Sequence, residues 1–236
     1  MLAFIRSLVF YIGYVPVTIL LSTLFITLFP LLPDRARHSF CAFWCRVILT
    51  WLRLSCGVCY QLKGVENLTH DSVVILANHQ SSWETILFYQ LMYPIAPILK
   101  KELMNIPFWG WALRLMKPIA IDRSKPRLAG KSLLDQGVKR LNKGFSIIIF
   151  PEGTRSPVGA MKTFSRGGAK LAIAANKPIL PIALDAGKCW PPNGFRKYPG
   201  LITVEFGQLI EPEGRDADSL TDEVESWVRK TVAQFS

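Results

Sequence analysis

The chain reads SVVILANHQSSWE at residues 72–84, and this stretch decides the fold class. Its apolar, β-branched start predicts a buried strand at residues 73–77, and the residues from 82 to 92 predict a helix that faces a core. Catalytic groups in α/β proteins are usually displayed where strands end. His79 and Glu84 lie there, and an imidazole beside an acid can take a proton from an alcohol. Acyl or group transfer to a hydroxyl is therefore the first hypothesis.

Strand-like and helix-like segments alternate along the chain after residue 64. Further strands are predicted at residues 96–100, 119–121, 146–150, 179–184 and 201–206, and further helices at residues 108–116, 128–142, 168–175 and 219–235. This alternation predicts an α/β domain over residues 61–236, with a mixed, mostly parallel sheet flanked by helices.

Two apolar helices are predicted in residues 1–60, joined by a break at residues 32–37. Residues 7–33 carry no charged side chain, and this length can enter or cross a bilayer. A cleavable signal peptide fits less well, because the apolar run exceeds a normal signal core and no small-x-small cleavage pattern follows it. Residues 1–60 therefore predict a membrane-associated helical hairpin.

Four arginines indicate how this hairpin meets the membrane. Arg46 and Arg53 share one face of the second helix, where an interfacial helix keeps them at headgroup level and a spanning helix would bury them at high cost. Arg35 and Arg37 would lie at the far end of a full transmembrane hairpin, against the positive-inside rule. We expect a hairpin within one leaflet, with a single span through the first helix as the alternative.

The charge distribution predicts acidic partners. The net charge is +11, and residues 100–170 contain fifteen Lys or Arg against four Asp or Glu. A basic surface beside an apolar anchor predicts membrane phospholipids and phosphorylated substrates as partners. Nucleic acid is not expected, because no nucleic-acid module is recognisable. The five cysteines form neither a disulfide framework nor a complete zinc pattern, so no metal site is predicted.

His79 and Glu84 are five residues apart, about 140° on an ideal helix, so they would not share a helical face. They can meet only if His79 precedes the helix and Glu84 lies in its first turn. The carboxylate would then fix one ring nitrogen while the other accepts a proton. Alternatively, Ser81 and Glu84 form a capping box and His79 is only a loop residue. The two interpretations are compatible, and this stretch alone supports them equally.

A second polar cluster, FPEGTRS, occupies residues 150–156 directly after a predicted buried strand. A plain turn containing Pro and Gly would explain this loop alone. However, Glu152, Thr154 and Arg155 would place a carboxylate, a hydroxyl and a guanidinium around a small polar ligand. The planar guanidinium is well suited to a pair of phosphate oxygens.

Together these stretches resemble the glycerophospholipid acyltransferase family, specifically the 1-acyl-glycerol-3-phosphate (lysophosphatidate) acyltransferases. His79-x4-Glu84 is similar to the family's His-x4-Asp box, with Glu where Asp is commoner. The loop at residues 150–156 matches its acceptor-phosphate motif. IAIDR at 119–123 and LPIAL at 180–184 resemble its second and fourth blocks, although Lys117 and Ala120 replace a usual Gly and aromatic residue. The resemblance covers about residues 63–210.

The resemblance implies a mechanism in which His79 deprotonates the sn-2 hydroxyl of a lysophosphatidate and Glu84 stabilises the imidazolium. The alkoxide attacks the thioester of acyl-CoA or acyl-carrier protein and gives phosphatidic acid, without an acyl-enzyme and without a cofactor. The donors imply the inner face of the cytoplasmic membrane, with the catalytic domain toward the cytosol. The residues expected to bind the glycerol-phosphate end are Arg123, Glu152, Gly153, Thr154 and Arg155, with Lys100 added because it ends a predicted strand.

Other functions remain open at this point. The same motifs suit an acyltransferase for glycerol-3-phosphate or another lysophospholipid. A non-catalytic phospholipid-binding module is a second alternative, although such a protein has no need of a base like His79 at a strand end. A membrane hydrolase is disfavoured, because the sequence has no Gly-x-Ser-x-Gly elbow.

Overall fold

The computed structural model describes residues 1–122 and 126–235. The strands are β1 (Val58–Lys63), β2 (Val74–Ala77), β3 (Ile95–Lys100), β4 (Ile119–Ile121), β5 (Ser146–Ile149), β6 (Ile179–Leu184) and β7 (Gly200–Phe206). The α-helices are α1 (Leu2–Leu28), α2 (Asp34–Cys56), α3 (Trp83–Leu91), α4 (Trp109–Leu115), α5 (Pro126–Leu141), α6 (Gly167–Ala175) and α7 (Ala217–Val232). Short 3-10 turns are η1 (Phe29–Leu31), η2 (Val65–Asn67), η3 (Lys101–Asn105) and η4 (Ala186–Lys188).

The strands form a sheet in the order β1-β7-β6-β2-β5-β3-β4. All neighbouring pairs are parallel except β6 and β7, which are antiparallel. The carboxyl ends of β2, β3, β4, β5 and β6 therefore meet at one edge, where such sheets usually carry their sites. The predicted mixed, mostly parallel α/β fold is confirmed.

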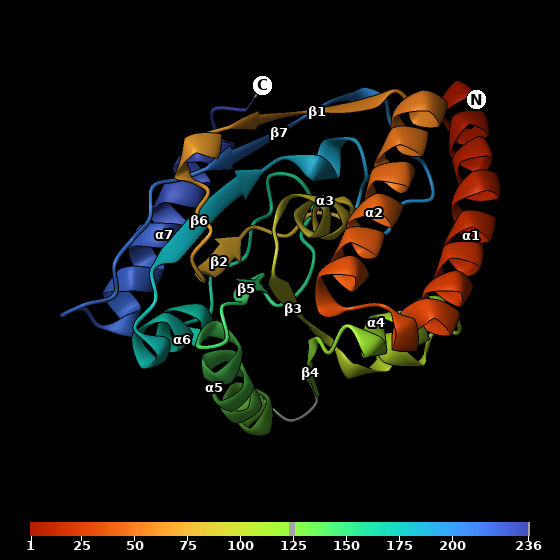
Figure 1. Ribbon diagram of the computed structural model, residues 1–236. Helices are drawn as coiled ribbons and strands as arrows, with labels where there is room; N and C mark the ends of the chain where they lie inside the picture. Colours follow the sequence, from red (N-terminus) through yellow and green to blue (C-terminus); the bar gives the residue numbers. More distant parts are fainter. Residues whose placement is uncertain (123–125, 236) are drawn as a thin grey trace.

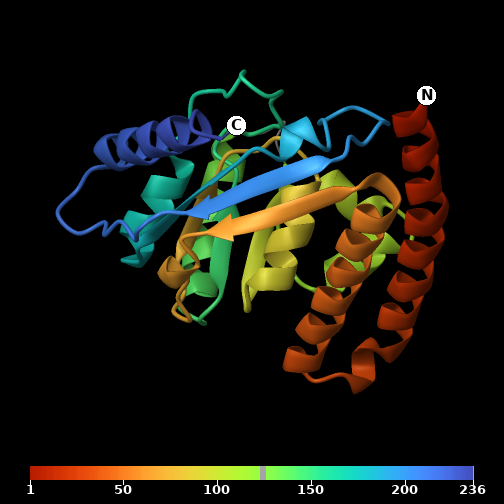
Figure 2. The same ribbon diagram turned by 90° about the horizontal axis from the view of Figure 1, so that it is seen from above.

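Helices cover both faces of this sheet (Figures 1 and 2). Side chains alternate along β2, because successive residues of a strand point to opposite faces. Ile75 and Ala77 join the core beneath the hairpin and α3, whereas Val74 and Leu76 join the core beneath α6 and α7. A Cβ at Gly168 would collide with Leu76, so glycine is what lets α6 approach the sheet closely. The central strands β2 and β6 are thus buried on both faces and position the carboxyl edge of the sheet.

The two N-terminal helices form the predicted hairpin, seen at the right of Figure 1. Both are long and apolar enough to cross a membrane, and most of their side chains are not buried in the protein. The indole nitrogen of Trp51 donates to the carbonyl of Phe10 at 3.0 Å, which fixes the two helices to each other. Arg46 and Arg53 are both exposed on α2, as their spacing predicted.

The junction after the hairpin differs from the prediction. The helical hairpin was expected to extend to about residue 60, but its second helix ends at Cys56, with Gly57 in the left-handed conformation at φ 73°. Edge strand β1 follows at once and was not predicted, so the expected boundary at residues 60/61 falls within a strand. Strand β1 forms through a contact that is distant in the sequence, because it pairs in parallel with β7 from Val58↔Gly200 onward. The other predicted strands and helices are confirmed to within a few residues.

Candidate active site

His79 and Glu84 meet at the carboxyl end of β2. The imidazole Nδ1 of His79 lies 2.8 Å from Oε1 of Glu84, and the glutamate side chain is fully buried. His79 precedes α3 and Glu84 lies in its first turn, as the proposed pairing requires. If Nδ1–H donates to this carboxylate, Nε2 carries the lone pair. Nε2 has no hydrogen-bond partner in the part of the chain that the structure describes, so it is available to a substrate hydroxyl.

Glu84 also binds the turn before α3, so half of the predicted capping box is present, although the N-cap residue is Ser82 and not Ser81. Its Oε1 accepts from the backbone amides of Gln80 at 2.9 Å and Ser81 at 2.7 Å. The hydroxyl of Ser81 accepts from the amide of Trp83 at 3.1 Å, and the helix begins at Trp83 with Ser82 as its N-cap residue. The capping bonds immobilise the carboxylate, and this immobility orients the imidazole.

Phe150 supports the other side of the imidazole. Its ring stacks on that of His79, with centroids 3.9 Å apart and planes within 14°. Phe88 of α3 lies behind Phe150, with centroids 6.5 Å apart. The imidazole is therefore held both in its plane, by Glu84, and across its face. The sequence had indicated Phe150 as the end of a strand and the start of the 150–156 motif, without a contact to His79.

Glu152 connects the two motif loops. Its Oε1 accepts from the amide of His79 at 2.7 Å, and its Oε2 accepts from the amide of Lys162 at 3.0 Å. The amide of Ser156 donates in turn to the carbonyl of His79 at 2.8 Å. Glu152 is buried and both its oxygens are engaged by backbone amides, so its side chain holds the His79 loop against the 150–156 loop.

Arg155 lies beside the start of α3. Its Nη1 donates to the hydroxyl of Ser82 at 3.0 Å, and its side chain is exposed. Thr154 is exposed on the same loop, and Gly153 has a φ of 73° with no atom near the position of a Cβ. Ser82 follows His79 by three residues, so this contact brings the guanidinium to the edge of the sheet that carries the imidazole.

Two buried side-chain amides, which the sequence analysis had not singled out, also hold the loops of this site in place. Asn78 exchanges a pair of hydrogen bonds with the backbone of Leu184, of 2.8 Å and 2.9 Å, which joins the ends of β2 and β6. Oε1 of Gln80 accepts from the amide of Gly187 at 3.0 Å. Sequence reasoning had no signal for these contacts, because their partners lie more than a hundred residues away.

The remaining predicted phosphate ligands lie further along this edge. Lys100 ends β3 with a half-exposed side chain, whose Nζ is 3.9 Å from Glu102. Lys101 pairs with Asp122 at 2.6 Å just after β4. Arg123 lies outside the described residues. Lys100 is on the same sheet edge as His79, two strands away from β2.

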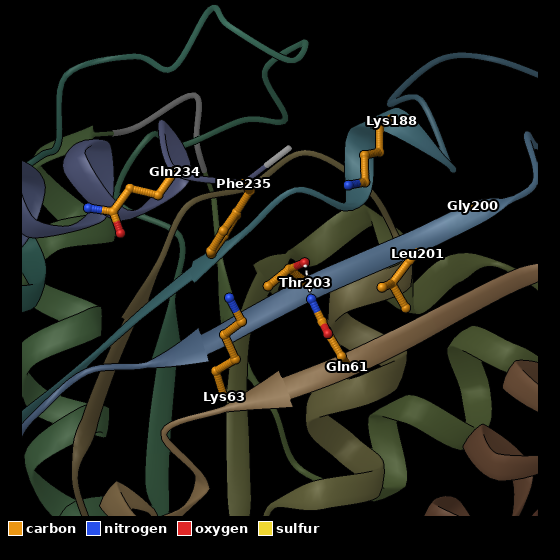
Figure 3. A pocket seen from close by; sticks show the side chains of 8 residues that line it. All are labelled: Gln61, Lys63, Lys188, Gly200, Leu201, Thr203, Gln234 and Phe235. Carbon is orange, nitrogen blue, oxygen red and sulfur yellow. Dashed lines mark hydrogen bonds between the residues drawn. The ribbon is translucent and has the colours of Figure 1, made fainter.

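The site shows no grouping typical of a metal centre: within residues 1–122 and 126–235, no cluster of three His, Cys, Asp or Glu side chains could hold an ion. A hollow of about 340 Å³ lies elsewhere, over β1 and β7 (Figure 3). It is lined by Gln61, Lys63, Lys188, Gly200, Leu201, Thr203, Gln234 and Phe235. None of the predicted site residues belongs to this hollow, so it is separate from the histidine site.

The arrangement can perform acid–base chemistry on an anionic substrate. It provides one oriented imidazole with a free nitrogen, a buried carboxylate that can stabilise its protonated form, and an exposed guanidinium at the start of the same helix. Proton abstraction from a hydroxyl requires the first two groups, and recognition of a phosphate is the usual task of the third.

Comparisons with known proteins agree with this chemistry. The model of the Acyltransferase family matches residues 59–185. A 1-acyl-sn-glycerol-3-phosphate acyltransferase of Pseudomonas aeruginosa is 45% identical over 98% of this chain and 92% of its own length. One from Limnanthes alba is 31% identical over 75% of this chain and 62% of its own. The crystal structure of the 1-acyl-sn-glycerophosphate (LPA) acyltransferase PlsC from Thermotoga maritima has the same fold, with a TM-score of 0.81 at 24% identity, over 99% of this chain and 97% of that one.

Proposed function

This chain belongs to the acyltransferase family, and we propose that it transfers an acyl chain from a thioester donor to the sn-2 hydroxyl of 1-acyl-sn-glycerol-3-phosphate. Its relatives carry the name of that activity. The observation that carries the proposal within the chain is the 2.8 Å contact between His79 and Glu84, at the start of the helix that Arg155 contacts through Ser82. The product of the reaction is phosphatidic acid.

His79 acts first as a base and then as an acid. Nε2 takes the proton of the sn-2 hydroxyl while Glu84 stabilises the resulting imidazolium through Nδ1–H. The alkoxide oxygen forms a bond to the thioester carbonyl carbon, and the carbon–sulfur bond breaks. The departing thiolate takes the proton back from Nε2, so no acyl-enzyme is formed and the histidine is ready for another turnover. Acyl-CoA and acyl-carrier protein both supply the required thioester.

The acceptor phosphate is bound by the basic side chains of the same edge. Arg155 contacts Ser82 at the start of α3 and presents an exposed fork of donors. Thr154 and the backbone at Gly153 lie on the same loop, Lys100 ends strand β3, and Arg123 is included from its place in the sequence motif. Glu152 serves a different purpose in this proposal, because its buried carboxylate positions the loops and repels an anionic phosphate.

The hairpin attaches the enzyme to the membrane that supplies its lipid substrate. We place it within one leaflet of the cytoplasmic membrane, with the catalytic domain toward the cytosolic donor. The exposure of Arg46 and Arg53 on α2 supports this arrangement, because a helix at the interface keeps both cations at headgroup level. A cysteine introduced at Arg35 should resist a membrane-impermeant thiol reagent added from the far side. Labelling from that side would contradict the in-leaflet position.

A reconstituted assay tests the reaction itself. The purified protein in phospholipid vesicles is given labelled acyl-CoA, or acyl-carrier protein, with lysophosphatidate, glycerol-3-phosphate or other lysophospholipids. We expect phosphatidic acid and one equivalent of free thiol only with lysophosphatidate. Product from another acceptor alone would reassign the substrate, and no product with any acceptor would contradict the enzymatic function.

A matched histidine pair tests the role of the base. His79→Ala should abolish turnover, whereas His70→Ala should leave it unchanged, because His70 is exposed on a loop away from the site. Both variants should remain bound to vesicles through the hairpin. Substantial turnover by His79→Ala would remove the general-base mechanism.

A further inference from the structure

The segment of residues 101–116 contains many apolar side chains that the fold does not bury. It comprises η3, a short connection and α4, and Gly110 is its one buried residue. Large side chains are exposed throughout it: Leu103 by 37%, Ile106 by 44%, Phe108 by 37% and Trp111 by 48%. Exposed apolar groups gathered in this way mark a surface that contacts something other than water.

The backbone of this segment holds the aromatic rings outward. Phe108 has a φ of 60°, a conformation that large side chains rarely adopt and that costs of order 1–3 kcal/mol. Its ring contacts that of Trp111, with centroids 5.5 Å apart. Gly110 makes the tight turn possible, because a Cβ there would collide with the backbone of Leu103. The fold thus maintains this exposed aromatic pair at some cost.

The segment continues the surface of the hairpin and carries its own cations. Helix α4 packs against α1 and lies beside the lower part of the hairpin in Figure 1. Lys101, Arg114 and Lys117 lie within or next to it, against Glu102 as its one acid. Aromatic and aliphatic groups with basic neighbours are the composition of elements that lie at an anionic lipid surface.

We propose that residues 101–116 form a third membrane-contacting element, inserted at headgroup level into the anionic phospholipid leaflet that holds the hairpin. The proposal rests on the membrane attachment given under the proposed function. The segment follows Lys100 directly, so it places the phosphate-binding edge of the sheet at the depth of the lipid headgroups. A lysophospholipid then reaches the site by lateral movement within the leaflet, without leaving it.

Tryptophan quenching tests the contact directly. The protein is reconstituted in vesicles of phosphatidylcholine and phosphatidylglycerol whose acyl chains are brominated near the headgroup. Trp111→Phe should lose part of the lipid-dependent quenching seen in the unaltered protein. The control Trp227→Phe, on α7 across the sheet, should lose none. Identical quenching in Trp111→Phe and the unaltered protein would overturn the proposal.

Kinetics with two acceptors test the consequence for substrate entry. Trp111→Ser should raise the KM for a long-chain lysophosphatidate in vesicles by about tenfold, the effect of losing one buried aromatic contact. It should leave kcat/KM for a water-soluble short-chain acceptor unchanged. Leu128→Ser, an exposed apolar position on α5, serves as the matched control and should change neither value.

The outcomes separate this proposal from the proposed function. Absence of acyl transfer in the unaltered protein would contradict the function, whereas the quenching result would still decide the membrane contact. Loss of turnover with both acceptors in Trp111→Ser would show that the segment supports the catalytic site and would overturn its membrane role. Conversion of a dimer to a monomer by Trp111→Ser in analytical ultracentrifugation, with quenching unchanged, would assign the surface to a second copy of the chain and overturn the proposal too.

Discussion

The backbone amide of Ser156 donates a hydrogen bond of 2.8 Å to the carbonyl oxygen of His79. This bond, with the buried Glu152 bridge, joins two loops that are separated by about seventy residues in the sequence. His79 and Arg155 consequently lie at one edge of the sheet. The proposed mechanism requires this, because one side chain has to deprotonate an acceptor whose phosphate the other binds.

Replacement of Glu84 should slow the chemical step. Glu84→Gln removes the charge that stabilises the imidazolium, so we expect kcat to fall roughly a hundredfold or more. Glu84→Asp keeps the charge with a shorter reach and should retain more activity than Glu84→Gln. Steady-state kinetics measure both, with circular dichroism to establish that the capped helix α3 persists. Equal kcat values for the two variants would show that charge is not what the site requires at this position.

Replacement of Glu152 should affect both stability and rate. Glu152→Gln sets an amide nitrogen against a backbone donor, which should cost about 1–3 kcal/mol of unfolding free energy. The kcat value should fall as well, because the His79 loop loses its tether. Denaturant unfolding and kinetics measure the two effects, and the exposed Glu213→Gln is the control. An unchanged stability would mean that the amide bonds to Glu152 carry little energy.

Replacement of Arg155 should act on acceptor binding. Arg155→Ala should raise the KM for lysophosphatidate at least about tenfold, since a charged hydrogen bond typically contributes 1.5–3 kcal/mol. The KM for the acyl donor should remain the same. Arg155→Lys should recover part of the loss, and Lys143→Ala, on an exposed turn, should have no effect. A donor KM that rises in parallel would place Arg155 in the donor site.

A buried lysine near the hairpin predicts an unusual pH dependence of stability. Lys197 is fully buried, and its Nζ donates to the carbonyls of Gly194 at 2.8 Å and Phe195 at 3.0 Å. The cation also lies over the rings of Trp190 and Tyr11, at 4.7 Å and 5.1 Å from their centroids. Burial lowers the pKa of Lys197 to about 8 from an ordinary value of 10.5.

Whether stability rises or falls with pH depends on how many protons the folded and unfolded states bind. Between pH 8 and 10.5 the unfolded chain keeps the Lys197 proton that the folded protein has released, so raising the pH stabilises the fold in this range. Below pH 8 both states are protonated and this contribution is constant. Thermal unfolding in detergent from pH 7 to 10.5 should show the rise in the unaltered protein, and Lys197→Met should reduce it. The same rise in Lys197→Met would attribute it to other groups.

The sequence predicted the parts of this structure that depend on local pattern. The buried strand before His79, the helix after it and the turn at residues 150–156 follow from short runs of residues and their spacing. β1 was missed because its six residues alternate weakly and lie at an edge, where pairing with β7 stabilises them. Gly57 was the available signal, since glycine commonly ends a helix.

The supporting roles at the site could not be predicted in the same way. Glu152 was expected to contact substrate, yet its partners are backbone amides of two other loops. Asn78 and Gln80 bind residues more than a hundred positions later, and Phe150 stacks on the ring of His79. Such contacts depend on how the loops meet in space, and residue type alone does not encode this.

The pairing of β1 with β7 orders events during synthesis. β1 follows the hairpin directly, but its only strand partner in the sheet is made about 140 residues later. The hairpin is therefore complete while β1 still has no β7 to pair with, and the sheet can close only after the last strand has been made.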